Sequence, residues 1–179
     1  MRAYRTLFLI VLALVCWSAL FYFIPATTLV ESVGIGNAYL ISFLISLLAG
    51  FSVFTGTAAY AAVIEFARGG ANPLYLGVIA GIGLFLSDSI FYLLVMRGRE
   101  ALSTRFGVFL TRFQRLVDYL PNPIVYIGVY LFCAFGPIPN DLMMTVMIIS
   151  GYKYKKIWPA LLAGDITFML FLSYLFHGT

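Results

Sequence analysis

The chain contains five long stretches in which apolar residues follow one another almost without interruption, at positions 6–24, 38–66, 73–96, 123–151 and 157–176. Charged residues lie mostly in the segments between these stretches. A helix needs about 20 apolar residues to cross a bilayer, so the pattern predicts membrane-embedded helices. The third and fifth stretches have the length of one crossing, whereas the second and fourth are clearly longer.

The two longer stretches each contain helix-breaking residues near the middle. In 38–66 these residues are Gly50 and the cluster Thr55-Gly56-Thr57, and in 123–151 they form the run Gly136-Pro137-Ile138-Pro139-Asn140-Asp141. Gly and Pro interrupt helices. We therefore predict that both stretches are helical hairpins, with their breaks at Gly56, Gly136, Pro137 and Pro139.

The composition agrees with a membrane protein. Of the 179 residues, 63% are hydrophobic and 10% are charged, and the mean hydropathy is +1.01. A soluble domain is about half apolar and about a quarter charged. The net charge of +4 comes from clustered cations, which is typical of orientation in a membrane and not of a nucleic-acid surface.

The positions of Lys and Arg select a topology. If all five stretches crossed the membrane, six of these cations would lie inside and five outside. If both long stretches re-enter, all of them except Arg68 become cytoplasmic, a ratio of ten to one. The positive-inside rule favours re-entry, with the first hairpin entering from the outside and the second from the cytoplasm. The chain is then a multi-pass protein of the cell (inner) membrane with a cytoplasmic N-terminus.

The predicted fold is an all-α integral membrane protein with an inverted repeat of a re-entrant helical hairpin plus a transmembrane helix, and an extra N-terminal span. The expected segments are an N-terminal transmembrane helix (1–30), a first repeat (31–96), a cytoplasmic amphipathic connector (97–121) and a second repeat (122–179). The tripeptide Ile79-Ala80-Gly81 aligns with Leu162-Ala163-Gly164, at a comparable depth after each of the two breaks. This architecture is typical of transporters and places a binding site near the midplane.

Four acidic residues lie inside apolar stretches: Glu65, Asp88, Asp141 and Asp165. An ionised Asp at the centre of a membrane helix costs about 2.5 to 3.5 kcal/mol, so such residues often bind a substrate or carry protons. For Glu65 a surface ion pair with Arg68 is an equal alternative. Asp141 and Asn140 would cap the second half-helix of their hairpin, or place its N-terminus to bind a lipid phosphate.

Asp88 shares a helix face with the small residues Gly77 and Gly81 and with Tyr92. Small residues allow a second helix to approach closely, so we expect Asp88 to point into protein and not into lipid. Asp165, beside Gly164, is expected at the equivalent place in the second half. A buried polar network is the structural alternative for both aspartates.

Basic residues near the cytoplasmic face could attract lipid headgroups. They are Arg112 and Arg115 of the connector together with Lys153, Lys155 and Lys156. The connector has apolar residues at steps of three and four, which predicts an amphipathic helix lying on the membrane or on the protein itself. Orientation in the membrane alone would also explain the three lysines.

A series of short motifs occurs along residues 38–176, and their order and spacing are informative. They are Gly70-Ala71-Asn72-Pro73, Gly83, Asp88, Tyr92 and Arg97-Gly98, then Gly136-Pro137-Ile138-Pro139-Asn140-Asp141, Gly151 and Ala163-Gly164. Together they resemble the motifs of the DedA family, also known as SNARE-associated Golgi or VTT-domain proteins. The resemblance implies movement of lipids between leaflets, of polyprenyl-phosphate carriers with proton coupling in bacterial relatives and of phospholipids in eukaryotic scramblases. Many members carry arginines beside the second-hairpin prolines, where this chain has Ala134, Phe135 and Asn140, and this departure bears on any proton-coupled mechanism that relies on them.

The sequence thus favours a DedA-like lipid transporter, a flippase or scramblase, with membrane lipids and, if transport is coupled, protons as partners. Two alternatives stay open: a proton-coupled exporter of small cations, and a non-catalytic scaffold, because small-residue faces also mediate homo-oligomers. The chain has one histidine, His177, and neither G-x-S-x-G nor H-E-x-x-H. We therefore expect no enzyme activity, no metal site and no cofactor.

Overall fold

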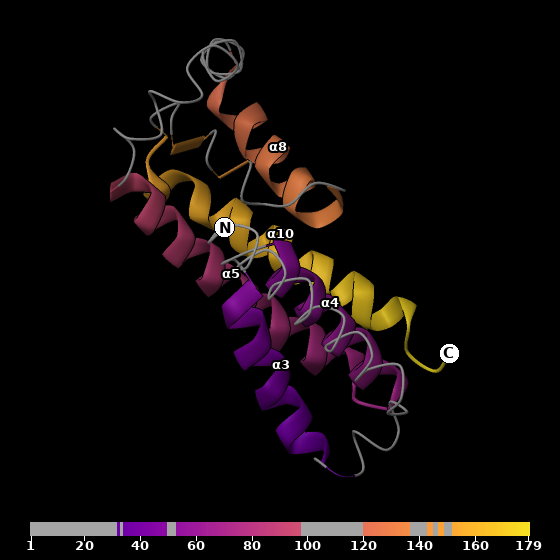
Figure 1. Cartoon of the computed structure of the whole chain (residues 1–179). Coiled ribbons are helices and arrows are strands. Elements are labelled where there is room, and N and C mark those ends of the chain that lie inside the picture. The colour runs from indigo at the N-terminus through magenta and orange to yellow at the C-terminus, as the bar shows by residue number, and fades with distance from the viewer. Residues whose placement is uncertain are drawn as a thin grey trace, which may run out of the picture.

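The computed structural model describes residues 32, 34–49, 53–97, 120–136, 143–144, 147–148 and 152–179. Within these residues all regular structure is helical, which confirms the predicted all-α class (Figure 1). The helices are α3 (Ile35–Ala49), α4 (Val53–Arg68), α5 (Pro73–Arg97), α8 (Asn122–Phe135) and α10 (Tyr154–Leu175). The predicted N-terminal span and the amphipathic connector lie outside the described residues.

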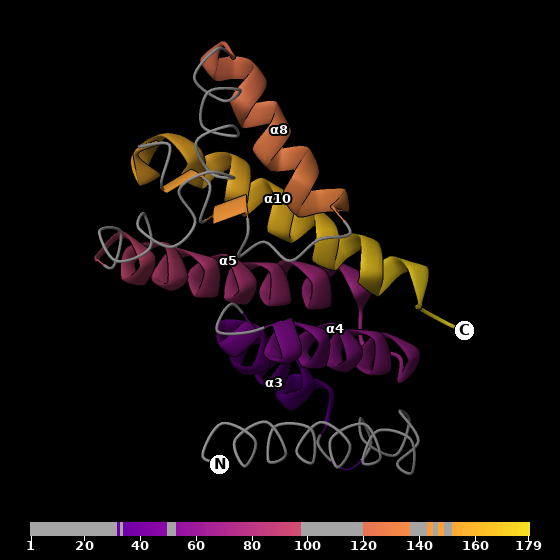
Figure 2. The same ribbon diagram turned by 45° about the horizontal axis from the view of Figure 1, so that its top comes forward.

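Two helices, α5 and α10, are long and apolar enough to cross a membrane, over Pro73–Leu93 and Tyr154–Leu175. They run antiparallel, because the Ser173 hydroxyl near the end of α10 donates to the Pro73 carbonyl at the start of α5 (2.8 Å). Figure 2 shows α8, α10, α5 and the α3–α4 pair as successive layers. The long antiparallel pair therefore forms the centre of the molecule, with one shorter element on each side.

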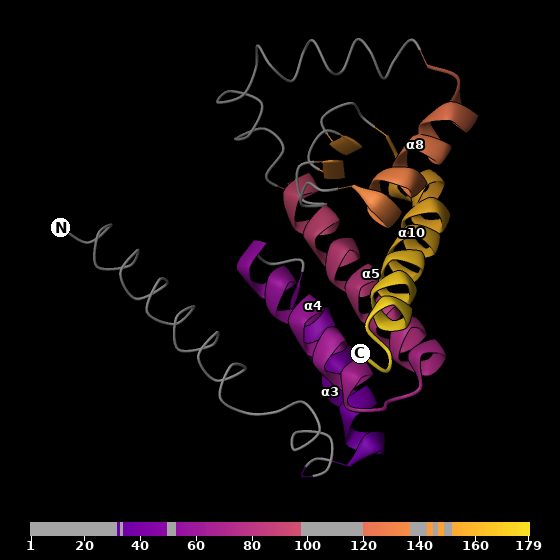
Figure 3. The same cartoon turned by 90° about the vertical axis from the view of Figure 1, so that its right-hand side faces the viewer.

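The helices α3 and α4 form an antiparallel hairpin on α5 (Figure 3). At its tip the Thr55 hydroxyl donates to the Ala49 carbonyl (3.0 Å), which supplies a partner for a carbonyl at the end of α3. At the opposite end the Asn72 N–H donates to the Tyr39 hydroxyl (3.0 Å). The chain thus enters and leaves this hairpin at the same end of α5.

The turn between α4 and α5 explains why a Gly-Ala-Asn-Pro motif occurs there. Gly70 has φ +90°, and the Gly70 and Ala71 N–H groups donate back to the carbonyls of Ala67 (3.2 Å) and Phe66 (3.0 Å), the pattern that ends a helix at a glycine. The Asn72 Oδ1 then accepts from the N–H of Leu74 (3.0 Å), which caps the start of α5. One helix is stopped and the next is started within four residues.

The predicted break at Gly56 is wrong. Gly56 lies inside the first turns of α4, and the interruption falls between Ala49 and Val53. A single glycine costs a helix only about 1 kcal/mol, so it does not by itself end one. Gly56 is buried, and a Cβ there would lie 3.6 Å from the Ala49 carbonyl oxygen, which is an ordinary contact.

In the second predicted hairpin, α8 ends at Phe135 and Gly136 follows in an extended conformation (φ −68°, ψ 131°), as predicted for a break at Gly136. The predicted breaks at Pro137 and Pro139 lie outside the described residues. Met143, Met144, Met147 and Ile148, which follow the predicted breaks, are buried in one cluster with Val125, Val129 and Cys133 of α8.

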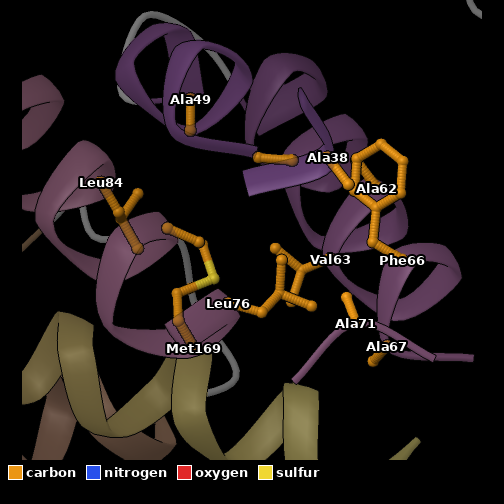
Figure 4. Packing of buried hydrophobic residues seen from close by; sticks show 12 residues of the cluster. Ala38, Ala49, Ala62, Val63, Phe66, Ala67, Ala71, Leu76, Leu84 and Met169 are labelled. Carbon is orange, nitrogen blue, oxygen red and sulfur yellow. The ribbon is translucent and has the colours of Figure 1, made fainter. Parts of the chain in front are cut away.

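Two apolar clusters stabilise the two ends of the molecule. The first joins α3, α4 and α5 with Met169 of α10, and small residues dominate it (Figure 4). The second joins α8, the start of α10 and the end of α5 with Met143, Met144, Met147 and Ile148. The helix α10 begins at Tyr154, earlier than the predicted span 157–176, so Lys155 and Lys156 belong to its first turn.

Candidate functional site

Two carboxyl side chains lie in the interior of the α5–α10 pair. Asp88 on α5 is 2% exposed and Asp165 on α10 is 0% exposed. Gly81 lies opposite Ile166, so Asp165 stands close to the level of Gly81 and Asp88 stands about 9 Å further along α5. Burial of a carboxylate costs free energy unless the group is hydrogen-bonded, paired or protonated, so two such residues mark a candidate site.

Glycines allow the close approach of α5 and α10. A Cβ on Gly77 would lie 2.7 Å from the Leu170 Cα, and a Cβ on Gly81 would lie 2.6 Å from the Ile166 Cα. Asp88 shares this face of α5 and is buried with it. The prediction that Asp88 is buried within the protein is therefore confirmed.

A third glycine brings α8 against α10 beside Asp165. A Cβ on Gly164 would lie 2.5 Å from the Cys133 Cβ and 3.1 Å from the Tyr130 carbonyl oxygen. The buried Cys133 thiol lies within electrostatic range of both Asp165 and Asp88. Cys133 has no role in the sequence-based prediction, and its only signal there is a small side chain in an apolar run. The two aspartates and this thiol are thus all buried around the α5–α10 pair.

Hydroxyl groups close the end of the pair where α10 begins. The Ser89 Oγ lies 2.6 Å from the Tyr154 hydroxyl, and the Tyr92 hydroxyl donates to the Tyr152 carbonyl. The Tyr92 and Tyr154 rings lie 5.2 Å apart. These contacts fix the start of α10 on α5 one turn beyond Asp88.

Glu65 lies at the opposite end of the molecule and is not brought together with the aspartates. It is paired with Arg68 at 3.4 Å, as the surface-pair alternative predicted. The Arg68 guanidinium also lies 5.2 Å from the centre of the Phe176 ring. The His177 Nδ1 is 3.3 Å from the Ala67 carbonyl oxygen. This end therefore carries a charge pair next to the C-terminal residues.

The remaining predicted site residues divide into two groups. Lys153, Lys155 and Lys156 are exposed at the start of α10, close to the tyrosine contacts. Attraction of lipid headgroups by these lysines stays a prediction. The others, Asn140, Asp141, Arg112 and Arg115, lie outside the described residues. Among the described residues no three His, Cys, Asp or Glu side chains gather closely enough to bind a metal ion.

Sequence reasoning missed five buried serines, and three of them belong to the seam between α3 and α5. Ser46 lies against Gly83, and Ser42 and Ser87 follow one turn away on the same faces of α3 and α5. A serine in a helix can bond to the backbone of its own helix, so a single serine gives no signal of a site. The pair Ser42 and Ser46, spaced one turn apart in an otherwise apolar stretch, could have been noticed as a polar stripe.

Comparison of the chain with protein-family models, with curated proteins and with solved structures finds no match in any of the three.

Proposed function

We propose that the protein is a membrane lipid transporter of the DedA type, a flippase or scramblase that works without covalent chemistry. One observation carries the proposal: Asp88 and Asp165 are buried between two long apolar helices. Carboxyls at membrane depth are expensive and are typical of substrate or proton pathways. The resemblance of the short motifs to those of the DedA family supplies the substrate class, phospholipids or polyprenyl-phosphate carriers.

Similar glycine contacts in the two halves support an inverted repeat, and they give the register that it would have. A Cβ on Gly83 of α5 would meet three atoms of α3, and a Cβ on Gly164 of α10 would meet three atoms of α8. The atoms are of the same kinds and follow the same spacing along the chain: a carbonyl oxygen (Phe43, Tyr130), a Cβ (Ser46, Cys133) and a backbone nitrogen (Leu47, Ala134). Each α8 residue follows its α3 counterpart by 87 positions. The two long helices thus hold their short helices in the same manner.

The burial pattern agrees with the same register. Gly164 follows Gly83 by 81 positions. The same offset separates the first residue of α10, Tyr154, from the first residue of α5, Pro73. With this offset every buried residue of α10 has a buried counterpart on α5. The pairs are Ile157 with Leu76, Leu161 with Ala80, Gly164 with Gly83, Asp165 with Leu84, Met169 with Asp88, and Ser173 with Tyr92. Because α5 and α10 run antiparallel, such a repeat is inverted.

This register differs from the sequence-based alignment, which paired Gly81 with Gly164. Gly83 is the better counterpart, since it contacts the short helix of its own half whereas Gly81 contacts α10. Asp165 then corresponds to Leu84, and Asp88 to Met169. The two carboxyls are therefore not equivalent positions of a symmetric site, and they lie at different depths along the α5–α10 pair.

The lengths of the helices fit re-entrant hairpins. The helices α3 and α8 have 15 and 14 residues, which corresponds to about 22 Å and 21 Å. The hydrocarbon core is about 30 Å thick, so neither helix would cross it, whereas α5 and α10 would. Two short helices that enter from opposite faces would end near the level of the aspartates, where a headgroup could pass between the leaflets.

A leaflet-exchange assay tests the proposal. Purified protein in liposomes that contain a fluorescent phospholipid is treated with a membrane-impermeant quencher, and the accessible fraction is followed with time. We expect protein-dependent exchange in the wild type that falls at least tenfold in Asp88→Asn and in Asp165→Asn. The matched control is Glu65→Gln, which removes a carboxyl charge on α4 and should leave the rate unchanged. Absence of exchange in the wild type would refute the function, and unchanged rates in both Asp variants would refute the site.

A proton-coupled exporter of small cations is the second candidate, because two carboxyls are buried at different depths of the same helix pair. Cation-dependent proton movement in the same liposomes, without lipid exchange, would select it. A scaffold is selected instead if the double variant Asp88→Asn, Asp165→Asn supports cellular function as well as the wild type does.

A further inference from the structure

The α3–α5 seam contains two hydroxyl groups that its packing leaves without hydrogen bonds. Ser42 is 1% exposed and Ser46 is 0% exposed, and neither Oγ has a hydrogen-bond partner among the described residues. A serine within a helix commonly bonds to the carbonyl four residues before it. A buried hydroxyl without any partner is costly. Two such groups one turn apart on the same face require an explanation beyond packing.

The second half of the molecule supplies an internal comparison. In the register given by the glycine contacts, the counterparts of Ser42 and Ser46 are Val129 and Cys133 of α8. Both counterparts are buried, and Cys133 contacts Gly164 as Ser46 contacts Gly83. An apolar pair of similar size therefore fills the same place on the other side. Helix packing alone does not need the two hydroxyls of α3.

The polar groups of this seam form a series that ends at Ser87. Ser42 and Ser46 are about 6 Å apart along α3. Ser46 lies at Gly83, and Ser87 follows one turn later on α5 next to Asp88. Ser87 and Asp88 are both buried. The series begins near the end of the molecule where Tyr39 contacts Asn72 and advances by about one helical turn at each step.

We propose that the α3–α5 seam binds a file of water molecules that leads from the aqueous phase on the Arg68 side to Ser87, the neighbour of Asp88 in the chain. A bound water needs two to four polar partners, and a serine hydroxyl can both donate and accept. Waters at one-turn intervals satisfy the Ser42 and Ser46 hydroxyls and provide a path along which a proton can move through the seam as far as Ser87. The role of this path in transport rests on the proposed function, but the presence of water in the seam does not.

Single thiols at equivalent positions of the two halves test the proposal. The first variant carries Cys16→Ser, Cys133→Ser and Ser46→Cys, so its single thiol lies at the Gly83 contact. Its matched control carries only Cys16→Ser, so its single thiol is the native Cys133 at the Gly164 contact. Ser42→Cys and Val129→Cys form a second pair. The probe is Ag⁺, a small hydrated thiol reagent, and the readout is loss of maleimide labelling after denaturation. We expect thiols at 42 and 46 to react at least tenfold faster than those at 129 and 133.

Blocking the path gives an independent test. Ser42→Val, which copies Val129, should slow the reaction at Ser46→Cys at least fivefold when Ag⁺ is added from the Arg68 side. Size-exclusion profiles and thermal unfolding of each variant check that it is folded. Equal or slower reaction at 42 and 46 than at their counterparts would overturn the proposal, as would a Ser42→Val variant without effect. Fast reaction in a protein that exchanges no lipid would leave the water file in place and refute only the transport function.

Discussion

Replacing Gly81 by alanine measures how closely α5 and α10 pack. The new Cβ would lie 2.6 Å from the Ile166 Cα and 3.0 Å from the Ile166 backbone nitrogen. Carbon atoms in contact prefer about 3.5 to 4.0 Å, so the helices must separate by about 1 Å. The close neighbours are mainly backbone atoms, which cannot rotate away. Overpacking of this kind typically costs about 1 to 3 kcal/mol of the free energy of unfolding.

The matched control is Gly128→Ala on α8, where a Cβ would have no neighbour within 4 Å. Both substitutions gain about 0.5 to 1 kcal/mol from replacing a helical glycine, so the difference between them isolates the steric cost. Unfolding is followed by tryptophan fluorescence during SDS titration in one detergent. We expect Gly81→Ala to be less stable than Gly128→Ala by about 1 to 3 kcal/mol. Equal stability of the two variants would refute the close α5–α10 contact and the burial of Asp88 that depends on it.

Three further predictions use the same unfolding measurement. Asn72→Ala should destabilise the protein by about 1 kcal/mol because the cap of α5 is lost, while Asn72→Asp retains it; similar stability of Ala and Asp variants would contradict the cap. Gly70→Ala should cost about 1 to 2 kcal/mol relative to Gly128→Ala because of the positive φ at Gly70, and a neutral effect would contradict that backbone conformation. Tyr92→Phe should lose about 1 kcal/mol with its hydrogen bond to the Tyr152 carbonyl, and an unchanged free energy would show that this bond does not hold the start of α10.

The predicted features that agree with the structure depend on local signals. The start of α5 at Pro73 follows from a capping asparagine and a proline in the first turn. The burial of Asp88 follows from helical periodicity, since Gly77 and Gly81 lie on its face. The end of α8 at Gly136 follows from a glycine before a proline-rich run. Each of these signals acts within a few turns of one helix.

Features that depend on contact between distant segments could not be predicted. Which glycine meets which helix is decided by tertiary packing, so the pairing of Gly83 with α3 and Gly164 with α8 has no local signal. The position of Gly56 inside α4 shows the same limit, because a helical glycine costs only about 1 kcal/mol and the packing of the whole helix outweighs it. The contact of Cys133 with Gly164, beside Asp165, likewise requires two helices to be placed together.

Cysteine-accessibility mapping in intact membranes tests most directly whether the hairpins return to the faces from which they enter. Single cysteines at Gly36, Arg68 and Thr179 sample one end of the molecule, and cysteines at Asn122 and Lys155 sample the other. All five positions are exposed. Arg68 is paired with Glu65, so its replacement also removes that ion pair. A membrane-impermeant maleimide should label the first three from one side only and the last two from the opposite side only. Labelling of the Gly36 and Arg68 positions from opposite sides would mean that the α3–α4 segment crosses the bilayer, and the account would be wrong.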